Sequence, residues 1–414
     1  MARIRLFFLA IASAATAYSK KTTLLIALSM VLCACQTQKT ESMSEKMVRS
    51  QMFRCPTAKY LDFKNGQLKW NYTPGLELKA YLDVYQTYGG EDIFSYVEAW
   101  YDEAVNEDGT INTYSVEKYS TDLICPAKSL FYLYDKTGKE KYRKAMDLVK
   151  TQVDGQPRTS EGAFWHKKVY PYQIWLDGVY MAEPFYVEYV TRYYPEDKKT
   201  EAYDDIVNEF VVAAKRTFDP ATKLYRHAFD ETQGMPWANS ETGQSQHCWG
   251  RALGWYCMAI LDVLDILPES YAGRNILTGI LNDICAELPK WADPETGVWY
   301  QVLDQPGREG NYLEATCSAM FSYTFLKGVR MGYLDSALLP YAKELYGYVV
   351  EEFISTDDEE GHISINHCCS VGGLGGSNMR MGDFAYYLSE KVVSNDCKGV
   401  GPFIWASLEM ERIK

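Results

Sequence analysis

Helix-length stretches of apolar and polar positions follow one another in pairs along the chain. The segments at 129–153 and 318–353 each contain two such stretches, in which apolar residues recur every three or four positions. This spacing places the apolar side chains on one face of a helix, as in an amphipathic helix that packs on a core. We therefore predict a pair of helices, joined by a turn, over each segment.

Similar acidic turns separate the helical segments. Copies that begin at Phe218, Ala292 and Ser355 each have acidic residues, then a lysine or glycine, then alternating apolar and polar residues. Looser copies begin at Asn106 and Ser160, which makes five in all. A unit of helix, turn, helix and acidic loop, repeated in this way, favours a helix-pair repeat over a fold of alternating strands and helices.

A closed ring explains the repeat better than an open stack of helix pairs. An open stack needs a polar cap at both ends, whereas the C-terminal stretch GPFIWASLEM from Gly401 is apolar. We predict an all-α domain, a closed six-fold (α/α)6 barrel of helix pairs, with the acidic loops on one rim. The alternative is an irregular all-α domain whose loops share turn residues for local reasons.

The N-terminal region predicts export and a lipid anchor. Lys20 and Lys21 precede the apolar run TTLLIALSMVLCA, and Cys35 follows that run. A basic segment, a short apolar segment and a small residue before a cysteine are typical of a secretory signal, and LCAC at 32–35 resembles the bacterial lipobox. The run is shorter than the ~20 residues of a membrane span. We therefore predict that Cys35 is acylated and that the protein is held in the bacterial cell envelope, facing the periplasm or the outside.

The division of the chain follows from this signal. We predict a lipoprotein signal region over 1–35, a flexible tether over 36–54 and a single catalytic barrel domain over 55–414, because no linker or low-complexity tract interrupts the last part. A second apolar run, RLFFLAIASAATA from Arg5, leaves open a later start codon or an uncleaved double apolar segment.

Composition narrows the class of partner. The net charge of −13 disfavours nucleic acid and anionic membrane surfaces. Aromatic residues make up 14% of the chain, and rings with polar tips suit sugar binding as well as other amphipathic interfaces. The 11 cysteines are scattered, show no CxxC pair and predict no disulfide framework. We expect a monomer that contacts a membrane through its lipid anchor only and binds no nucleic acid.

The segment HCWGRALGW at 247–255 is the densest group of candidate binding residues. On a helix, His247, Arg251 and Trp255 would share one stripe, with Gly250 and Gly254 beside it. A glycine inside a helix costs about 1 kcal/mol relative to alanine, so two of them indicate the close approach of a ligand or a neighbouring helix. A guanidinium beside indole rings suits a carboxylate held in a fork. The alternative is a structural role, in which two helices cross here, the tryptophans belong to the core and the aliphatic part of the arginine packs against them.

Two aspartates each lead an apolar helical pattern. Asp177 lies in the aromatic stretch YPYQIWLDGVYMAEPFY, and Asp122 lies in TDLICPAKSLFYLY. Both would be ordinary as helix N-caps. If they point into one ring instead, they form a carboxyl pair in an apolar cleft, where burial and repulsion raise at least one pKa toward use as a general acid. Pro184 predicts a kink or a short helix after Asp177.

Several motifs in one order resemble the unsaturated rhamnogalacturonyl hydrolase family, glycoside hydrolase family 105. They are NYTPG at 71–75, TDLICPAKSLFYLY at 121–134, WLDGVYMAEPF at 175–185, LYRHAFDE at 224–231, HCWGRALGW at 247–255 and RMGDFAYYLSEKVVSNDCKGVGPF at 380–403. The resemblance spans nearly the whole chain from Asn71 to the end. It implies a six-fold α/α barrel, which agrees with the ring predicted from the repeats.

The resemblance also implies roles for individual residues. It makes Asp177 the catalytic acid/base and Asp122 the second acid of the pocket. It implies substrate contacts for His227, Trp249, Arg251, Trp255 and, as a weaker match, Tyr72.

Some neighbouring residues match the family less well. MRMGDFAYY departs from the usual run of arginine, aspartate, glycine and serine, which leaves Arg380 and Asp383 open as site residues. His247 and Glu314 are possible pocket liners only. The glycine-rich segment SVGGLGG from Ser370 lacks the spacing of a nucleotide-binding loop, and we interpret it as a mobile rim.

The chemistry implied by the family is the hydration of an unsaturated sugar. Polysaccharide lyases leave oligosaccharides that end in a 4,5-unsaturated uronic acid; protonation at C4 and addition of water at C5 release this residue from the rest of the chain. One acid that also acts as a base suffices, with a raised pKa as the requirement, and no metal or cofactor is needed. The substrate partner is therefore an oligosaccharide with an unsaturated uronate end.

Three other functions stay open at this point. The enzyme acts on glucuronyl rather than galacturonyl lyase products, or it is an inverting hydrolase of saturated glycans on the same barrel, or the protein is a non-catalytic glycan-binding lipoprotein. An acid in an apolar cleft has no use in a binding module, which disfavours the last of these.

Overall fold

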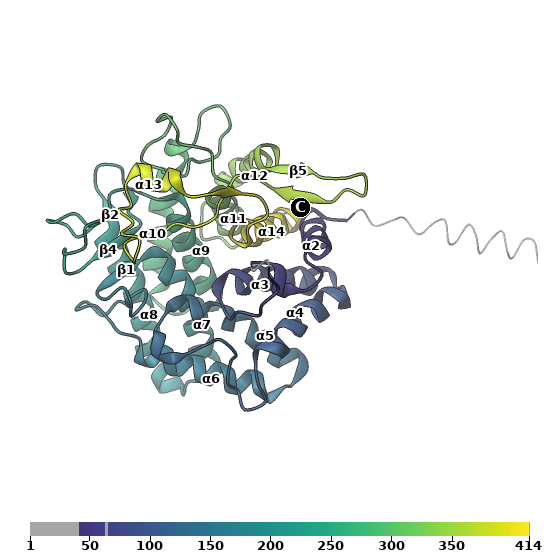
Figure 1. The fold of residues 1–414 in the computed structure, drawn as a ribbon. Coiled ribbons are helices and arrows are strands. Elements are labelled where there is room, and N and C mark those ends of the chain that lie inside the picture. The colour runs from purple at the N-terminus through teal and green to yellow at the C-terminus, as the bar shows by residue number, and fades with distance from the viewer. Residues whose placement is uncertain (1–40, 63–64, 414) are drawn as a thin grey trace, which may run out of the picture. The chain divides into compact units, whose positions relative to one another are not determined.

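Six pairs of helices make up most of the protein. The computed structural model describes residues 41–62 and 65–413, and the compact unit begins at Met43. Thirteen α-helices lie in these residues (Figure 1). One helix of each pair lines the axis of the barrel and the other packs outside it. The inner helix α9 buries 14 of its 17 residues, whereas its outer partner α10 buries four of 14.

Each inner helix has one outer partner. The inner helices are α3 (Tyr72–Tyr88), α5 (Lys128–Thr137), α7 (Leu176–Tyr193), α9 (Gly250–Ile266), α11 (Ala315–Arg330) and α14 (Cys397–Arg412). Their outer partners, in the same order, are α4 (Glu91–Ala104), α6 (Glu140–Gly155), α8 (Glu196–Thr217), α10 (Arg274–Glu287), α12 (Leu339–Phe353) and α2 (Met43–Arg54).

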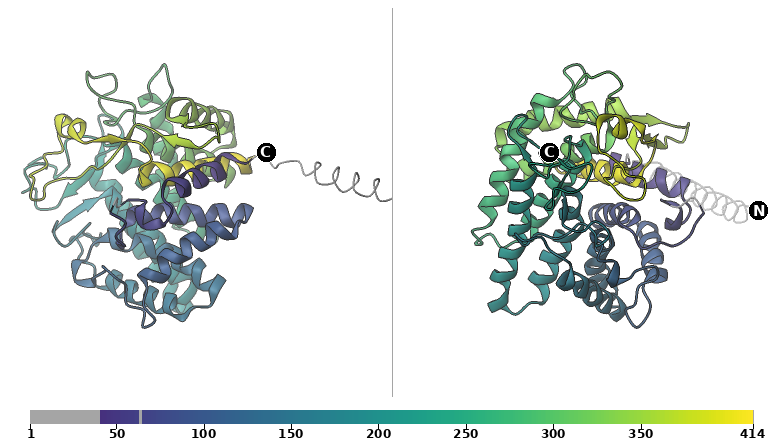
Figure 2. Two further views of the ribbon diagram at one scale, coloured as in Figure 1. Left: turned by 45° about the vertical axis from the view of Figure 1, so that its right-hand side comes forward. Right: turned by 60° about the vertical axis from the view of Figure 1, so that its left-hand side comes forward.

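The ring closes between the two ends of this unit. Helix α14 packs against both α11 and α3, and α2 packs on α14. Figures 1 and 2 show purple α2 beside yellow α14. Helices α3, α5, α7, α9, α11 and α14 thus form one inner ring. The predicted all-α, closed (α/α)6 barrel is confirmed.

The sixth pair corrects the described part of the tether that was predicted over 36–54, because residues 43–54 are helical. Residues Met43–Arg54 form α2, in which Met47 and Val48 are fully buried. Polar residues of α2 are buried too because they have distant partners: Ser50 Oγ accepts the Ile363 N–H at 2.9 Å, and Gln51 Nε2 donates to Glu77 Oε1 at 3.1 Å. The predicted signal region over 1–35 and its Cys35 lie outside the described residues.

Short antiparallel ladders fold the loops between the helix pairs. They join β1 (Gln173–Trp175) to β4 (Ala228–Asp230), β2 (Phe218–Asp219) to β3 (Leu224–Tyr225), β5 (Ile354–Thr356) to β6 (Ile363–Ile365) and β7 (Cys368–Cys369) to β8 (Val392–Val393). Two of these hairpins lie in the acidic turns predicted from Phe218 and Ser355. Short helix α13 (Phe384–Ser389) lies between β7 and β8 in the chain.

Two helix glycines lie where α9 meets α11. A Cβ on Gly250 would lie 2.8 Å from Cys317 Sγ, and a Cβ on Gly254 would lie 2.6 Å from Met320 Sδ. The predicted close approach is therefore that of a neighbouring helix. Pro184, by contrast, lies inside α7, which continues to Tyr193 and is not short.

Two further properties concern only the described residues. None of their helices is long and apolar enough to cross a membrane. Their nine cysteines are all free.

Candidate active site

The amino-terminal ends of the inner helices α3 and α7 meet a 3-10 helix and several loops around one cavity of about 230 Å³. Tyr72 is the first residue of α3 and Asp177 the second residue of α7, and Asp122 lies in the 3-10 helix Thr121–Leu123 that precedes α5. The cavity is lined by Asn71, Tyr72, Asp122, His166, Lys167, Tyr170, Trp175, Asp177, Met181, Val371, Gly372, Gly373 and Arg380. Helix amino-termini carry a positive partial charge, which favours an anionic ligand here.

Asp177 is paired with a buried histidine rather than used as a helix cap. The N-cap of α7 is Trp175, and that cap makes no side-chain hydrogen bond. Asp177 Oδ2 lies 3.3 Å from His227 Nε2, and the Asp177 side chain is 13% exposed while His227 is fully buried. The other imidazole nitrogen, Nδ1, lies 2.8 Å from the hydroxyl of Tyr387. His227 is therefore held from behind and supports the carboxylate from the side away from the cavity.

The ladder between β1 and β4 brings this pair together. Trp175 pairs with Ala228, and the Leu176 N–H donates to the His227 carbonyl at 3.2 Å. Asp177 comes two residues after β1 and His227 directly before β4, so the pairing of these strands brings the two side chains together.

The pKa of Asp177 is lowered, which corrects the predicted raised value. Burial alone raises the pKa of this carboxyl, but the neighbouring His227 and, with a smaller effect, the charge of Arg251 outweigh burial. In this structure Asp177 is thus held in its carboxylate form.

Asp122 has a cation and an imidazole beside it. Its Oδ2 pairs closely with Lys167 Nζ, and its Oδ1 lies 3.8 Å from His166 Nε2. Burial lowers the pKa of His166 well below its usual value, so the imidazole is neutral. His166 Nδ1 lies 3.0 Å from the hydroxyl of Thr121. Asp122 is therefore an ion-paired carboxylate in a fixed position on the cavity wall.

Three parallel rings form a second part of the wall. The ring centre of Trp175 lies 4.6 Å from that of His166 and 5.1 Å from that of Tyr170, with interplanar angles of 17° and 9°. Arg380 continues this wall, because its Nη2 donates to the Tyr170 hydroxyl at 3.2 Å. The stack has the flat, amphipathic character that suits a sugar ring.

Four residues that the resemblance assigns to substrate contact lie behind the cavity wall. His227, Trp249, Arg251 and Trp255 are each at most 1% exposed, and none of them lines the cavity. Gly372 separates Trp249 from the cavity, since a Cβ at Gly372 would lie 2.4 Å from the Trp249 ring. Trp255 contacts Tyr72 edge to face at 6.4 Å between ring centres.

Arg251 is a buried support in this structure. Its Nη1 donates to the Cys369 carbonyl, and its guanidinium carbon lies 4.5 Å from the Trp249 ring centre. Arg251 therefore holds the start of the glycine-rich segment. Among the described residues that line the cavity, the cations are Lys167 and Arg380.

Several other candidates have structural roles. Asp383 caps α13 by accepting the Tyr386 N–H at 2.8 Å, and Glu314 caps α11 by accepting the Cys317 N–H at 2.8 Å. His247 precedes α9, which begins at Gly250, and its Nδ1 lies 2.9 Å from Asp304 Oδ2. The predicted helical stripe through His247 is therefore wrong, and none of these three residues lines the cavity.

The wall residues that were not predicted include three that lie close together in the chain. His166, Lys167 and Tyr170 lie in the turn that begins at Ser160. That turn precedes the Asp177 motif directly and carries a histidine, two lysines and a tyrosine, which was the available signal. Arg380, left open by the resemblance, does line the cavity.

Comparisons with known proteins agree with this geometry. The profile of Glycosyl Hydrolase Family 88 matches residues 43–414. The chain is similar to Protein Atu3128 of Agrobacterium fabrum, with 36% identity over 242 residues that cover 55% of this chain and 97% of that protein. It is also similar to the unsaturated rhamnogalacturonyl hydrolase YesR of Bacillus subtilis, with 26% identity over 256 residues, 60% of this chain and 68% of that protein.

Solved structures extend the likeness to the whole barrel. A family 105 glycoside hydrolase from C. acetobutylicum is 44% identical, covers 90% of this chain and 100% of that one, and has a TM-score of 0.85. An unsaturated glucuronyl hydrolase specific for heparin is 13% identical with a TM-score of 0.62, covers 89% of this chain and 97% of that one, and shows the fold alone. The chain therefore belongs to glycosyl hydrolase family 88, together with the family 105 enzymes, and is a glycoside hydrolase.

Proposed function

We propose that the protein removes the 4,5-unsaturated uronic acid from the non-reducing end of lyase-generated pectic oligosaccharides of the rhamnogalacturonan type. The observation that carries this proposal is the position of Asp177, on a cavity wall with His227 behind it and with Asp122, Lys167 and Arg380 around the same cavity. The activity named for the relative YesR supports the choice of substrate.

The reaction needs one proton donor and one water molecule. The unsaturated uronate is an enol ether, so protonation at C4 places positive charge on C5 and the ring oxygen. Water then adds at C5 and loses a proton. The hemiketal formed in this way opens at its bond between C5 and the ring oxygen: the proton of the C5 hydroxyl passes to the ring oxygen, which leaves a ketone at C5 and a hemiacetal at C1. The hemiacetal then becomes an aldehyde as its bond between C1 and the oxygen of the rest of the oligosaccharide breaks, and its hydroxyl proton is transferred to the leaving oxygen.

Asp177 is the group we assign to both proton transfers. It gives the proton to C4 and, as a carboxylate, then takes the proton of the attacking water. The lowered pKa in this structure means that Asp177 must first gain a proton. A substrate carboxylate beside Asp177 and the exclusion of water both act to raise that pKa, so binding of the correct anionic substrate prepares its own proton donor.

The neighbours of Asp177 have supporting roles in this proposal. His227 orients the carboxylate through the contact at 3.3 Å. Asp122, held by Lys167, accepts hydrogen bonds from sugar hydroxyls or from the water. The ring stack of Trp175, with its two partners, provides a flat surface for the sugar.

An acidic protein has to attract an anionic sugar by local charge. The net charge of −13 is screened beyond about 8 Å at physiological salt. Lys167 and Arg380 on the wall, Arg251 beneath it and the amino-termini of the inner helices together provide that local positive charge. We assign the uronate carboxylate to the wall cations Lys167 and Arg380, whereas Arg251 holds the Cys369 carbonyl behind the wall.

Loss of the alkene's ultraviolet absorbance tests this proposal. Purified protein should remove the absorbance of lyase-digested rhamnogalacturonan and release the uronic acid in its open-chain form, with a ketone at C5 and an aldehyde at C1. Saturated oligogalacturonides have no such absorbance to lose and should not yield this product. Faster turnover of glycosaminoglycan lyase products would assign the enzyme to glucuronyl substrates instead. Turnover of saturated glycans alone would favour an inverting hydrolase, and no turnover of any of these sugars would overturn the proposal.

We also propose that Cys35 carries a lipid anchor that holds the enzyme in the bacterial cell envelope. The motif LCAC after a basic and apolar run supports this proposal. Cys35→Ala should move the protein from the membrane fraction to the soluble fraction. A variant that fractionates like the wild type would show that the anchor assignment is wrong.

A further inference from the structure

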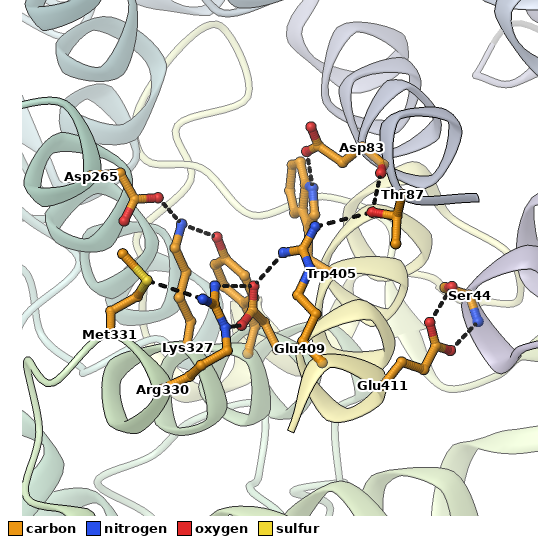
Figure 3. A network of polar contacts seen from close by, with 12 residues as sticks. Ser44, Asp83, Thr87, Asp265, Lys327, Arg330, Met331, Trp405, Glu409 and Glu411 are labelled. Atoms are coloured by element: carbon orange, nitrogen blue, oxygen red, sulfur yellow. Dashed lines mark hydrogen bonds and ion pairs between the residues drawn. The ribbon is translucent and has the colours of Figure 1, made fainter. Parts of the chain in front are cut away.

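A second cavity of about 240 Å³ lies among the inner helices and shares no lining residue with the catalytic cavity. All six inner helices contribute to its lining, and most of these side chains are charged. Figure 3 shows part of its polar network. Nothing in the catalytic mechanism uses these residues.

The charged residues of this cavity have ion-pair partners, with one exception. Lys327 Nζ lies 2.5 Å from Asp265 Oδ2, and Arg330 Nη2 donates to Glu409 Oε1 at 2.9 Å (Figure 3). The Trp405 indole donates to Asp83 Oδ2 at 2.7 Å. The carboxylates of the network are therefore already supplied with donors.

Lys128 is the exception. This first residue of α5 lines the cavity, is 6% exposed, and its Nζ makes no hydrogen bond and no ion pair among the described residues. The Nζ atom lies 3.5 Å from the ring centre of Tyr180. A ring face attracts a cation but does not neutralise it.

The other cations of the lining each have an ion pair. Lys79 pairs with Asp83, Lys327 with Asp262 and Asp265, and both Arg330 and Arg412 with Glu409. Among the described residues, Lys128 is therefore the one cation of this lining without an ion pair.

We propose that this cavity binds a small monovalent anion, chloride or a short carboxylate, on the Nζ of Lys128. A buried charge without a partner is unfavourable unless it loses its proton or gains a counter-ion. The one unpartnered ammonium of Lys128 calls for a ligand with a single negative charge, and the cavity volume limits the size of that ligand. The site lies beneath the catalytic cavity, since the Tyr180 ring stacks on Trp255 at 4.8 Å and Trp255 contacts Tyr72.

The competing state is a neutral amine. Burial lowers the pKa of Lys128, while the Cys125 thiol and Asp262 act in the opposite direction. Lys79 adds to the lowering, and a bound anion would act against it. A neutral Lys128 has no need of an anion, so a direct search for the anion distinguishes the two states.

Bromide, which replaces chloride and scatters anomalously, is the probe. Crystals of the wild type grown or soaked in bromide should show an anomalous peak in contact with Lys128 Nζ. Crystals of Lys128→Met should lack that peak but keep any surface bromide sites. The absence of a peak at Nζ in wild-type crystals that show other bromide sites would overturn the chloride form of the proposal.

Stability measurements in solution test both forms of the ligand. Chloride and acetate are titrated separately at constant ionic strength, with Lys128→Met and the exposed control Lys198→Met, whose side chain is 61% exposed. An anion that binds only the folded state raises the ratio of folded to unfolded protein up to tenfold for each tenfold rise above its Kd. Wild type and Lys198→Met should gain stability with one of the anions, while Lys128→Met gains none. Equal responses of all three proteins to both anions would overturn the proposal.

Discussion

His227 Nε2 lies 3.3 Å from Asp177 Oδ2, and the two side chains form a pair beside the catalytic cavity. The histidine is fully buried, whereas the carboxyl lines the cavity. Because the imidazole is fixed on its other side by Tyr387, it controls both the direction and the protonation of the carboxyl. The pH dependence of the enzyme should therefore depend on His227.

We expect His227→Ala to move the alkaline limb of the kcat/KM profile to higher pH. The reaction begins with protonated Asp177, so kcat/KM falls as pH rises above the pKa of Asp177. His227 lowers that pKa, and its removal raises the pKa and carries the fall in rate to higher pH. The absolute rate should drop as well, because the carboxyl loses its support.

Tyr387→Phe is the matched control for this variant. It removes the hydroxyl behind the imidazole and leaves the imidazole in place, so the limb should move less. A limb that stays at the wild-type pH or moves to lower pH in His227→Ala would contradict the assigned role of the histidine.

A buried carboxyl pair predicts that stability falls as pH rises. Glu183 and Glu209 are 1% and 3% exposed, and neither Glu183 oxygen has a hydrogen-bond partner among the described residues. Burial raises the pKa of Glu209 from 4.5 to about 8 and raises the pKa of Glu183 as well. Because the folded state binds these protons more tightly than the unfolded state, the stabilisation is complete below about 4.5 and is lost as pH rises toward 8.

Glu209→Gln should flatten this pH dependence. The glutamine carbonyl keeps the acceptor for the Phe164 N–H, which lies 2.8 Å from Glu209 Oε2, and the side chain no longer titrates. Chemical denaturation at pH 5 and pH 8 measures the effect, with Glu201→Gln, whose side chain is 85% exposed, as the control. An equal loss of stability in Glu209→Gln and wild type between these pH values would refute the assignment.

Alanine should have opposite effects on the free energy of unfolding at a glycine packed between α9 and α11 and at an exposed helix glycine. Gly254→Ala places a Cβ 2.6 Å from Met320 Sδ and should lower the free energy of unfolding, because the neighbouring helix has to move. Gly279→Ala in α10 meets no atom within 4 Å and should raise it by up to about 1 kcal/mol through helix propensity. Thermal unfolding of both variants provides the comparison, and a stabilised Gly254→Ala would contradict the packing of these helices.

If the wall cations bind the uronate carboxylate, variants of Lys167 and Arg380 should change the substrate preference, whereas a variant of the buried Arg251 should not. A hydrogen bond to a charged group is worth about 1.5–3 kcal/mol, or roughly 10–150-fold in kcat/KM. Arg380→Met and Lys167→Met should each lose most of the preference for the free acid over the methyl ester of one unsaturated disaccharide. Arg251→Lys should lower thermal stability and keep that preference. If only Arg251→Lys loses the preference, the carboxylate is bound by Arg251 and not by the wall cations.

Periodicity predicted the barrel because most inner and outer helices carry their own apolar stripe. Helix α2 was missed because its buried polar residues depend on partners far away in the sequence, such as the contact of Ser50 with Ile363. No local pattern contains that information. The residues of this sixth outer helix were therefore assigned to a tether.

Sequence reasoning found the acids of the site more reliably than the cavity surface. Asp177, Asp122 and Tyr72 do line one cavity, as the resemblance implied. Trp249 and Trp255 lie behind the wall because other residues, such as Gly372, come between them and the cavity. The residues that face the cavity are determined by how the turn from Ser160, the glycine-rich segment from Ser370 and Arg380 pack together. The spacing of residues within one motif contains no information about this packing.

The central claim is that Asp177 protonates the unsaturated uronate, and one measurement tests it most directly. The loss of alkene absorbance is followed for wild type and Asp177→Asn with an unsaturated rhamnogalacturonan disaccharide, after equal thermal unfolding curves show that both are folded. General acid–base transfer contributes about 10²- to 10⁴-fold, and one group acts here in two steps. We predict a loss near 10⁴-fold with little change in substrate binding. A variant that stays within about tenfold of the wild type, well below that range, would contradict the account.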